Sequence, residues 1–234
     1  MNSSEGIVPL LKAVPYLASL PSHVLRAIAA RSPSKSFRAG QSVFTEGDPC
    51  HHLHILESGR VKFYRTSPEG REQVMRVFER PGDTFCIPSA FRAGTYIVSA
   101  RAVTDARLYL LDVDTLNRLG EEHPSVALKL VATAGEHMMH LVALAEDLSL
   151  KTATARLAKH LYELAVADAS RTGQEIRLPR ERLPEEELAS MLGTVRVHVS
   201  RSLMNLVRAG AIDLDRSFIR IADLTALKQI AERK

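Results

Sequence analysis

The sequence predicts an α+β protein: a β-rich first half, one long helix, and a last third of short helices with a β-hairpin near its end. Three observations carry this prediction. In the first half, five glycines recur every 11 or 12 residues with short β-rich runs between them. The apolar pattern changes to a helical period near residue 125, and turn residues separate short helical segments after residue 180. The recurring glycines are Gly47, Gly59, Gly70, Gly82 and Gly94.

The first half has the pattern of an antiparallel sandwich or jelly roll. Short runs of β-branched and aromatic residues, bounded by turn residues, are typical of that architecture. Two turns are explicit, at residues 67–70 (Ser-Pro-Glu-Gly) and 80–83 (Arg-Pro-Gly-Asp). A short helix over residues 21–30 is expected to precede the sheets. The expected strands cover residues 53–56, 61–64, 74–78, 96–103 and 107–111.

Residues 125–148 have the pattern of one long helix, because they contain no proline, a single glycine and many strong helix formers. Its apolar residues alternate steps of four and three, which is the a/d spacing of a coiled-coil pair. An amphipathic helix that packs only on its own sandwich is the alternative, and we favour a homodimer because the alternation is strict. The predicted dimerisation residues are Val131, Ala134, Met138, Leu141, Ala145 and Leu148.

The last third has the order of a helix-turn-helix. An amphipathic helix over residues 151–169 and a short strand near 175–178 come first. Three glutamates then follow Pro184, a sequence that suits a helix N-terminus. Gly193 breaks this helix, and a second helix is expected over residues 195–209. The second helix of such a motif enters the major groove of DNA.

A hairpin and a concentration of positive charge accompany this motif. Gly210 ends the second helix, residues 211–214 and 218–221 form a hairpin of the kind called a wing, and Asp223 caps a last helix. Residues 151–234 hold 15 Lys or Arg against 11 Asp or Glu, whereas the first 150 residues hold 16 of each. Release of counterions from DNA phosphates makes this placement favourable, although so small an excess also fits an ordinary solvated surface.

Composition limits the class of protein. A chain of 234 residues that is 45% hydrophobic and 25% charged suggests one or two globular domains. No apolar run approaches the ~20 residues of a membrane span, and no secretory signal is recognisable. Two cysteines are too few for a disulfide framework, so a reducing, cytoplasmic setting fits. We do not expect an enzyme, because no phosphate-binding glycine loop, HExxH motif or nucleophile elbow is present.

In order and spacing, these segments resemble the CRP/FNR family of bacterial transcription regulators. The likeness begins with residues 40–48 (GQSVFTEGD), continues through 56–62 (LESGRVK) and 82–85 (GDTF), and returns at 147–157 and in the winged helix. It covers nearly the whole chain. The resemblance implies a homodimeric regulator with a sensor jelly roll like a cyclic-nucleotide-binding domain at residues 1–122, a dimerisation helix at 123–150 and a winged helix-turn-helix domain at 151–234.

The resemblance also assigns the residues that read DNA. Arg201 is the strongest candidate, because its guanidinium can hold O6 and N7 of guanine with two hydrogen bonds. Val197 departs from the family, which usually has a glutamate there that accepts from cytosine N4. Valine can only pack, so we expect an inverted-repeat operator that is altered at that base pair; for Val197 and Val199 a place in the helix core is the alternative. The full predicted set is Thr194, Arg196, Val197, His198, Ser200 and Arg201.

The effector stays open. Family members that bind cyclic nucleotides use a glutamate and an arginine near the positions of Ile87 and Tyr96, so we do not expect cyclic AMP. Two cysteines cannot supply the four ligands of the family's iron–sulfur cluster.

Haem remains an option, because residues 85–89 resemble the haem-ligand segment of the carbon-monoxide sensors, and the long helix is similar to that of nitric-oxide-responsive members. A proline replaces the histidine of that haem segment. The candidate effector residues are Phe85, Cys86, Ile87, Pro88 and Tyr96, and Cys86 is alternatively a redox-sensitive thiol or a buried apolar residue.

Two histidine clusters are further candidates. In the first, one cysteine and two histidines would share one face of a strand and could bind a soft metal, but a solvated strand edge is the simpler interpretation. The second lies one turn apart on the long helix. We predict no metal site at either. The first cluster contains Cys50, His51, His52 and His54, and the second contains His137 and His140.

The sequence thus predicts a homodimeric regulator that binds double-stranded DNA and responds to a small molecule, a gas or a redox signal. As an activator it would also contact RNA polymerase. The alternative is a constitutive DNA-binding regulator whose output follows its expression level. Full promoter binding without any additive would favour that alternative.

Overall fold

The computed structural model describes residues 3–89, 94–172 and 176–233. The chain divides into two compact units, residues 1–65 with 75–141 and residues 66–74 with 142–234. Antiparallel sheets and helices form where the sequence predicts them, so the predicted α+β class is confirmed.

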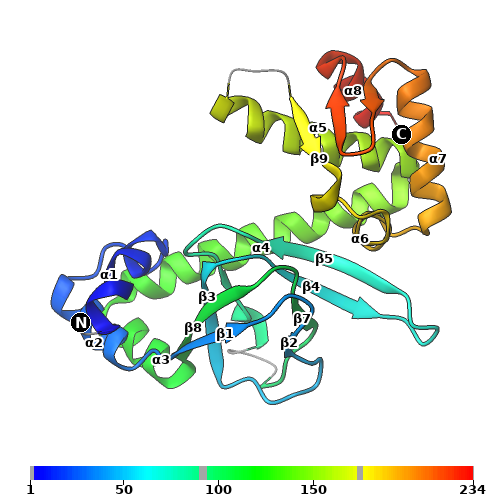
Figure 1. The fold of residues 1–234 in the computed structure, drawn as a ribbon. Coiled ribbons are helices and arrows are strands. Elements are labelled where there is room, and N and C mark those ends of the chain that lie inside the picture. Colours follow the sequence, from blue (N-terminus) through cyan, green and yellow to red (C-terminus); the bar gives the residue numbers. More distant parts are fainter. Residues whose placement is uncertain (1–2, 90–93, 173–175, 234) are drawn as a thin grey trace. The chain divides into compact units, whose positions relative to one another are not determined.

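Two four-stranded sheets form the β roll of the first unit, and every pairing of known register in them is antiparallel (Figure 1). Aromatic side chains fill the space between the sheets. One sheet has the order β1 (Ser34–Phe37), β8 (Ala106–Asp112), β3 (His52–Ser58) and β6 (Thr84–Phe85). The other has the order β2 (Ser42–Phe44), β7 (Ser99–Ala102), β4 (Val61–Thr66) and β5 (Glu72–Phe78).

The predicted strands form, with one correction. A single strand is expected over residues 96–103, but β7 begins only at Ser99. The reason is that Tyr96 pairs with the loop before β3: its N–H donates to the carbonyl of Asp48 (2.9 Å), and its carbonyl accepts from Gly47 (2.8 Å). The strand β1 escapes prediction because three of its four residues are polar and exposed, so that it has no alternating pattern.

Helices cover the outer face of the sheet that contains β3. Alternate residues of a strand point to opposite faces. Leu53 and Ile55 therefore pack among the helices, in what we call the helix core, while Leu56 packs between the two sheets, in what we call the aromatic cluster. Both faces of β3, in the middle of this sheet, are therefore buried. The helices that gather here, at one end of the roll, are α1 (Ser3–Ala13), α2 (Ser22–Ala30), α3 (Val113–Glu122) and the first part of α4 (Pro124–Leu150) (Figure 1).

The second unit is the predicted winged helix-turn-helix. An apolar core joins its helices to a three-stranded antiparallel sheet. The Asp223 side chain caps the last helix, as predicted, by accepting from the N–H groups of Thr225 and Ala226. The elements are α5 (Ala153–Thr172), β9 (Arg177–Pro179), the 3₁₀ turn Arg180–Arg182, α6 (Glu185–Met191), α7 (Arg196–Arg208), β10 (Ile212–Leu214), β11 (Phe218–Ile221) and α8 (Leu224–Ala231).

Candidate DNA-binding surface and sensor site

The turn between α6 and α7 depends on Gly193. Its φ of +60° lies in the left-handed region, which costs a glycine nothing and strains other residues. The next N–H, that of Thr194, donates to the carbonyl of Ala189 (2.9 Å) and closes the turn. The chain then enters α7 at Arg196, so this turn sets where the recognition helix begins.

The helix α7 has one buried face and one exposed face. Val199, Leu203 and Leu206 are buried in the core of the second unit, which confirms a core position for Val199. Val197, by contrast, is 66% exposed, and the core position considered for it is wrong. The exposed face carries Arg196, Val197, His198, Ser200 and Arg201, and Thr194 is half-buried at its start.

Two of these side chains have partners within the unit. The Arg196 guanidinium lies 3.5 Å from a carboxylate oxygen of Glu185 and 3.8 Å from one of Glu186. His198 Nδ1 lies 3.2 Å from the Thr194 hydroxyl. Because exposed ion pairs are weak, the acidic first turn of α6 orients Arg196 only weakly.

The wing has its own polar support. The Asp215 carboxylate accepts from the N–H groups of Ser217 (2.7 Å) and Phe218 (2.6 Å), and these bonds hold its pKa below the ordinary value. Arg180 donates to the Asp215 carbonyl (3.2 Å) and lies 3.5 Å from a Glu185 carboxylate oxygen. The contact of Arg180 with the wing is not evident from the sequence, because Asp215 lies 35 residues further along the chain.

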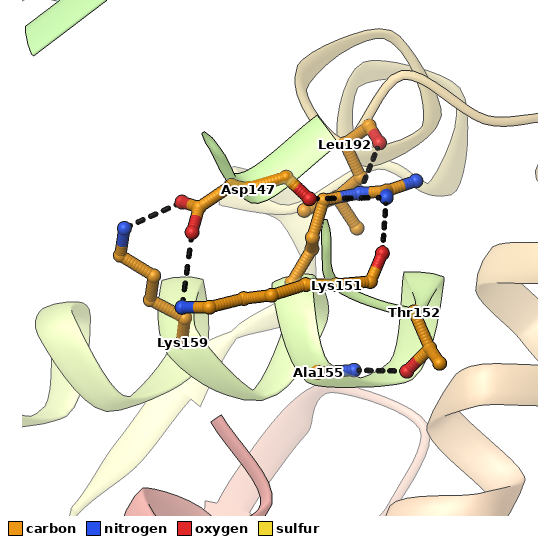
Figure 2. A network of polar contacts seen from close by, with 7 residues as sticks. Asp147, Lys151, Thr152, Ala155, Lys159 and Leu192 are labelled. Carbon is orange, nitrogen blue, oxygen red and sulfur yellow. Dashed lines mark hydrogen bonds and ion pairs between the residues drawn. The ribbon is translucent and has the colours of Figure 1, made fainter. Parts of the chain in front are cut away.

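A polar network joins the end of α4 to the recognition motif (Figure 2). The Arg156 side chain donates to three backbone carbonyls: Leu192 (2.8 Å), at the end of α6, and Lys151 (2.7 Å) and Asp147 (3.4 Å), at the end of α4. It therefore ties the end of α4 to the turn of the helix-turn-helix, since Leu192 stands at the end of α6.

Asp147 completes this network with two ion pairs, to Lys151 (2.9 Å) and to Lys159 (2.5 Å) (Figure 2). Burial acts to raise the pKa of Asp147, but the hydrogen bonds and charges of the two lysines outweigh it and leave the pKa below the ordinary value. The carboxylate therefore stays ionised at neutral pH and holds both lysines at the junction of α4 and α5.

The helix α4 presents an apolar seam that the described chain leaves uncovered. Val131 is 71% exposed and Met138 62% exposed, while Ala134 is half-buried against the helix core of the first unit. Of the other predicted dimerisation residues, Leu141 and Ala145 are exposed and Leu148 is half-buried. The predicted set does not include four further exposed apolar side chains on this helix, which are Leu128, Met139, Val142 and Leu150.

In the sensor roll, Cys86 lies among aromatic rings. Its Sγ is 3.7 Å from Nδ1 of His54, whose ring is stacked on Phe85 with centroids 5.2 Å apart. His54 is buried, so the expected solvated strand edge is wrong for this residue. Burial, followed by the charges of His52 and Lys35, lowers the pKa of His54 to about 3, so its ring is neutral at physiological pH.

Cys50 requires a second correction, because it lies before β3 rather than on one strand face with His52 and His54. Its N–H donates to the carbonyl of Gly94 (2.9 Å), and its thiol faces the backbone carbonyl of His52 (3.7 Å). Among the described residues, no group of three His, Cys, Asp or Glu side chains is arranged to hold a metal ion.

The remaining predicted effector residues lie in three different environments. Ile87 is buried in the helix core, and Pro88 is exposed. The Tyr96 ring is stacked on Phe44 with centroids 3.7 Å apart, inside the aromatic cluster. On α4, His140 Nε2 lies 3.1 Å from the carbonyl of Met75, and His137 packs edge-on against Phe78.

Comparison with known proteins identifies both parts of the chain. Residues 34–123 match the cyclic nucleotide-binding domain, and residues 155–230 match the Crp-like helix-turn-helix domain. The chain is 30% identical, over 83% of its length and 86% of the relative's, to the CRP-like cAMP-activated global transcriptional regulator of Mycobacterium tuberculosis. The chain belongs to the CRP/FNR family of transcription regulators.

Other CRP/FNR proteins are similar over comparable lengths. The fumarate and nitrate reduction regulatory protein of Escherichia coli is 27% identical and covers 84% of this chain and 78% of its own. The structure of a CooA mutant from Carboxydothermus hydrogenoformans is similar with a TM-score of 0.71 and 25% identity, over 87% of this chain and 89% of that one.

Membership confirms the predicted function in outline. CRP/FNR proteins are DNA-binding transcription regulators with a signal-binding domain, and this chain is therefore a regulator and not an enzyme. The family binds DNA as dimers, so DNA is a partner of this chain as well. In the described part of the chain, no helix is long and apolar enough to cross a membrane.

Proposed function

We propose that this CRP/FNR regulator reads an inverted-repeat operator as a homodimer, with Arg201 and Ser200 on base edges and Val197 against an apolar part of a base pair. The observation that carries the proposal is the exposed face of α7, which presents these side chains together while Val199, Leu203 and Leu206 hold the opposite face in the core. In a two-fold dimer, two such helices face successive major grooves.

The division of labour along the chain belongs to this proposal. Residues 1–122 sense a signal, residues 123–150 pair the protomers, and residues 151–234 bind DNA. The exposed apolar seam of α4 supports the pairing, since exposed apolar side chains at heptad spacing are typical of a helix that meets a partner helix. The regulator acts in the cytoplasm, and as an activator it contacts RNA polymerase.

The effector is not a cyclic nucleotide in this proposal. A cyclic phosphodiester needs a charged anchor, and near the two positions that the family uses stand Ile87, buried in the helix core, and Tyr96, stacked inside the aromatic cluster. Neither side chain can hold a phosphate through a charge-assisted bond.

The test of DNA reading compares Arg201→Ala with the native protein on an operator selected from random DNA. We expect a loss of ~1–3 kcal/mol on the selected site and relaxed discrimination at one base pair of each half-site. Arg208→Ala, at an exposed arginine near the end of α7, serves as the control. Equal weakening by Arg201→Ala on selected and random DNA would place Arg201 on a phosphate and contradict the assignment.

A further inference from the structure

The β roll contains a pair of cysteines to which DNA binding assigns no role. Cys50 lies in the loop before β3 and Cys86 directly after β6, and both are free thiols buried in the aromatic cluster. Both share this cluster with Tyr96, and the side chains of Cys86 and Tyr96 lie close enough to Cys50 to lower its pKa. Two segments distant in sequence thus bring their thiols into one buried cluster inside the sensor.

The backbone of Cys86 is strained. Its φ is +77°, and it is the one non-glycine residue of the described ranges with a positive φ. A side chain in the left-handed region is held there by its surroundings, and such strain gathers at switch regions. Here it accompanies a thiol that lies inside the roll, with Sγ 3.7 Å from His54 Nδ1.

We propose that Cys50 and Cys86 are a reactive thiol pair that a hydroperoxide oxidises reversibly to an intramolecular disulfide. In the first step the Cys50 thiolate attacks one peroxide oxygen, the O–O bond breaks, and Cys50 becomes a sulfenic acid while water or an alcohol leaves. In the second step the Cys86 sulfur attacks Cys50 Sγ, the S–O bond breaks, and the hydroxide leaves as water with the thiol proton. Two thiols and one hydroperoxide thus give one disulfide, one water and one water or alcohol.

The surroundings of the two sulfurs decide which thiol reacts with the peroxide first. The hydrogen bond from Cys86 lowers the pKa of Cys50, helped by Tyr96 and the backbone at His52, and outweighs the opposing effect of burial. Burial raises the pKa of Cys86. Because the thiolate is the nucleophile, Cys50 attacks the peroxide and Cys86 resolves the sulfenic acid. The neutral His54 ring beside Cys86 can accept a hydrogen bond from its thiol until that step.

Ile87, the residue after Cys86, connects this pair to the dimerisation helix. Cys86 belongs to the aromatic cluster, whereas its neighbour Ile87 belongs to the helix core together with Val126 and Leu130 of α4. A disulfide holds its sulfurs at about 2.05 Å, far closer than a thiol contact. Closing it draws the Cys86 backbone toward Cys50 and shifts Ile87 against α4. This regulatory consequence rests on the proposed function, whereas the thiol chemistry does not.

The chemistry is tested on the reduced full-length protein with hydrogen peroxide at one equivalent. We expect both thiols to disappear, the intact mass to fall by two hydrogen atoms, and a single disulfide-linked peptide to join Cys50 to Cys86; dithiothreitol should reverse all three. This measurement needs no variant. Thiols that persist, or disulfides only between chains, would overturn the proposal.

Two matched variants test the order of the steps. In Cys86→Ser, Cys50 should accumulate as a sulfenic acid that dimedone traps, whereas Cys50→Ser should consume peroxide at least ~10-fold more slowly than the native protein. Equal peroxide rates for Cys50→Ser and the native protein would overturn the assigned order. Thermal unfolding followed by circular dichroism checks that each variant folds, and Cys86→Ala replaces Cys86→Ser if the latter does not.

The regulatory consequence is read from affinity for the selected operator before and after oxidation. We expect a change of at least ~10-fold that dithiothreitol reverses and that Cys50→Ser lacks. A disulfide that forms without any change in affinity would overturn the regulatory part. Failure of both the reduced and the oxidised protein to prefer any DNA would contradict the proposed function instead, while the thiol measurements would stand.

Discussion

Arg156 is the side chain through which the structure makes the sharpest stability prediction. Its guanidinium forms two short hydrogen bonds, to the carbonyls of Leu192 (2.8 Å) and Lys151 (2.7 Å), and a longer one to Asp147 (3.4 Å) (Figure 2). Each joins a charged donor to a backbone carbonyl at the end of a helix, where the orphan carbonyls need partners. Removing the side chain therefore breaks the hydrogen bonds that connect the end of α4 to the end of α6.

The expected loss of unfolding free energy follows from the two short hydrogen bonds of Arg156. Hydrogen bonds to charged groups contribute about 1.5–3 kcal/mol each when buried, and Arg156 is only half-buried, so ~1 kcal/mol for each is appropriate. Arg156→Ala should thus lower the free energy of unfolding of the second unit by ~2 kcal/mol. Arg156→Lys keeps the charge but not the planar fork that reaches two carbonyls, so it should recover about half of the loss.

Urea denaturation followed by far-ultraviolet circular dichroism measures these values, since the chain has no tryptophan to report by fluorescence. Arg182→Ala, at an exposed arginine of the same unit, is the matched control and should cost less than ~0.5 kcal/mol. A loss below ~0.5 kcal/mol for Arg156→Ala, or full recovery by lysine, would refute the reasoning that the directed fork ties the two helices.

Two further predictions concern the sensor and the seam. The pKa of His54 falls from an ordinary 6.5 to about 3 on folding, so the unfolded chain binds more protons between these values. Stability is therefore complete above pH ~6.5 and is lost as pH falls, by ~2 kcal/mol at pH 5. His137, whose pKa is lowered to about 4 by burial and by Arg76, adds to this loss. In urea titrations, His54→Gln should flatten the pH dependence, and an unchanged slope would contradict it. Val142→Glu should dissociate the predicted dimer in sedimentation experiments, since it buries a charge in an apolar seam. Ala143→Glu, at an exposed position in line with Glu136 and Glu146, should leave the dimer intact; dissociation by both would argue against the seam.

The recognition motif is the part of the site that local sequence describes well. Gly193, the acidic start of α6 and the apolar spacing of α7 are local signals, so the turn, the helix and the core position of Val199 follow from them. The exposure of Val197 does not follow from the sequence, since valine occurs on both the buried and the exposed face of a helix. Only the packing of Val199 and Leu203 decided which side of α7 faces outward.

The sensor site shows where local reasoning ends. A strand period places Cys50, His52 and His54 on one face, but the strand starts at His52 and Cys50 joins the loop that pairs with Gly94. The burial of His54 depends on the opposite sheet, which supplies Phe44, and on Phe85 of the neighbouring strand. The helix α3 and the short strands β1 and β6 likewise lack a pattern strong enough to predict.

The sequence by itself determined the order of the parts, the long helix with its apolar seam, and the recognition helix with Arg201, because each depends on residues near one another in the chain. Only the tertiary structure decided that Cys50 and Cys86 share one buried cluster, with Cys86 beside His54, and that Arg156 reaches the end of α6. These contacts join residues that are distant in sequence. Their energies come from burial and from hydrogen-bond geometry, and neither exists until the two segments have packed together.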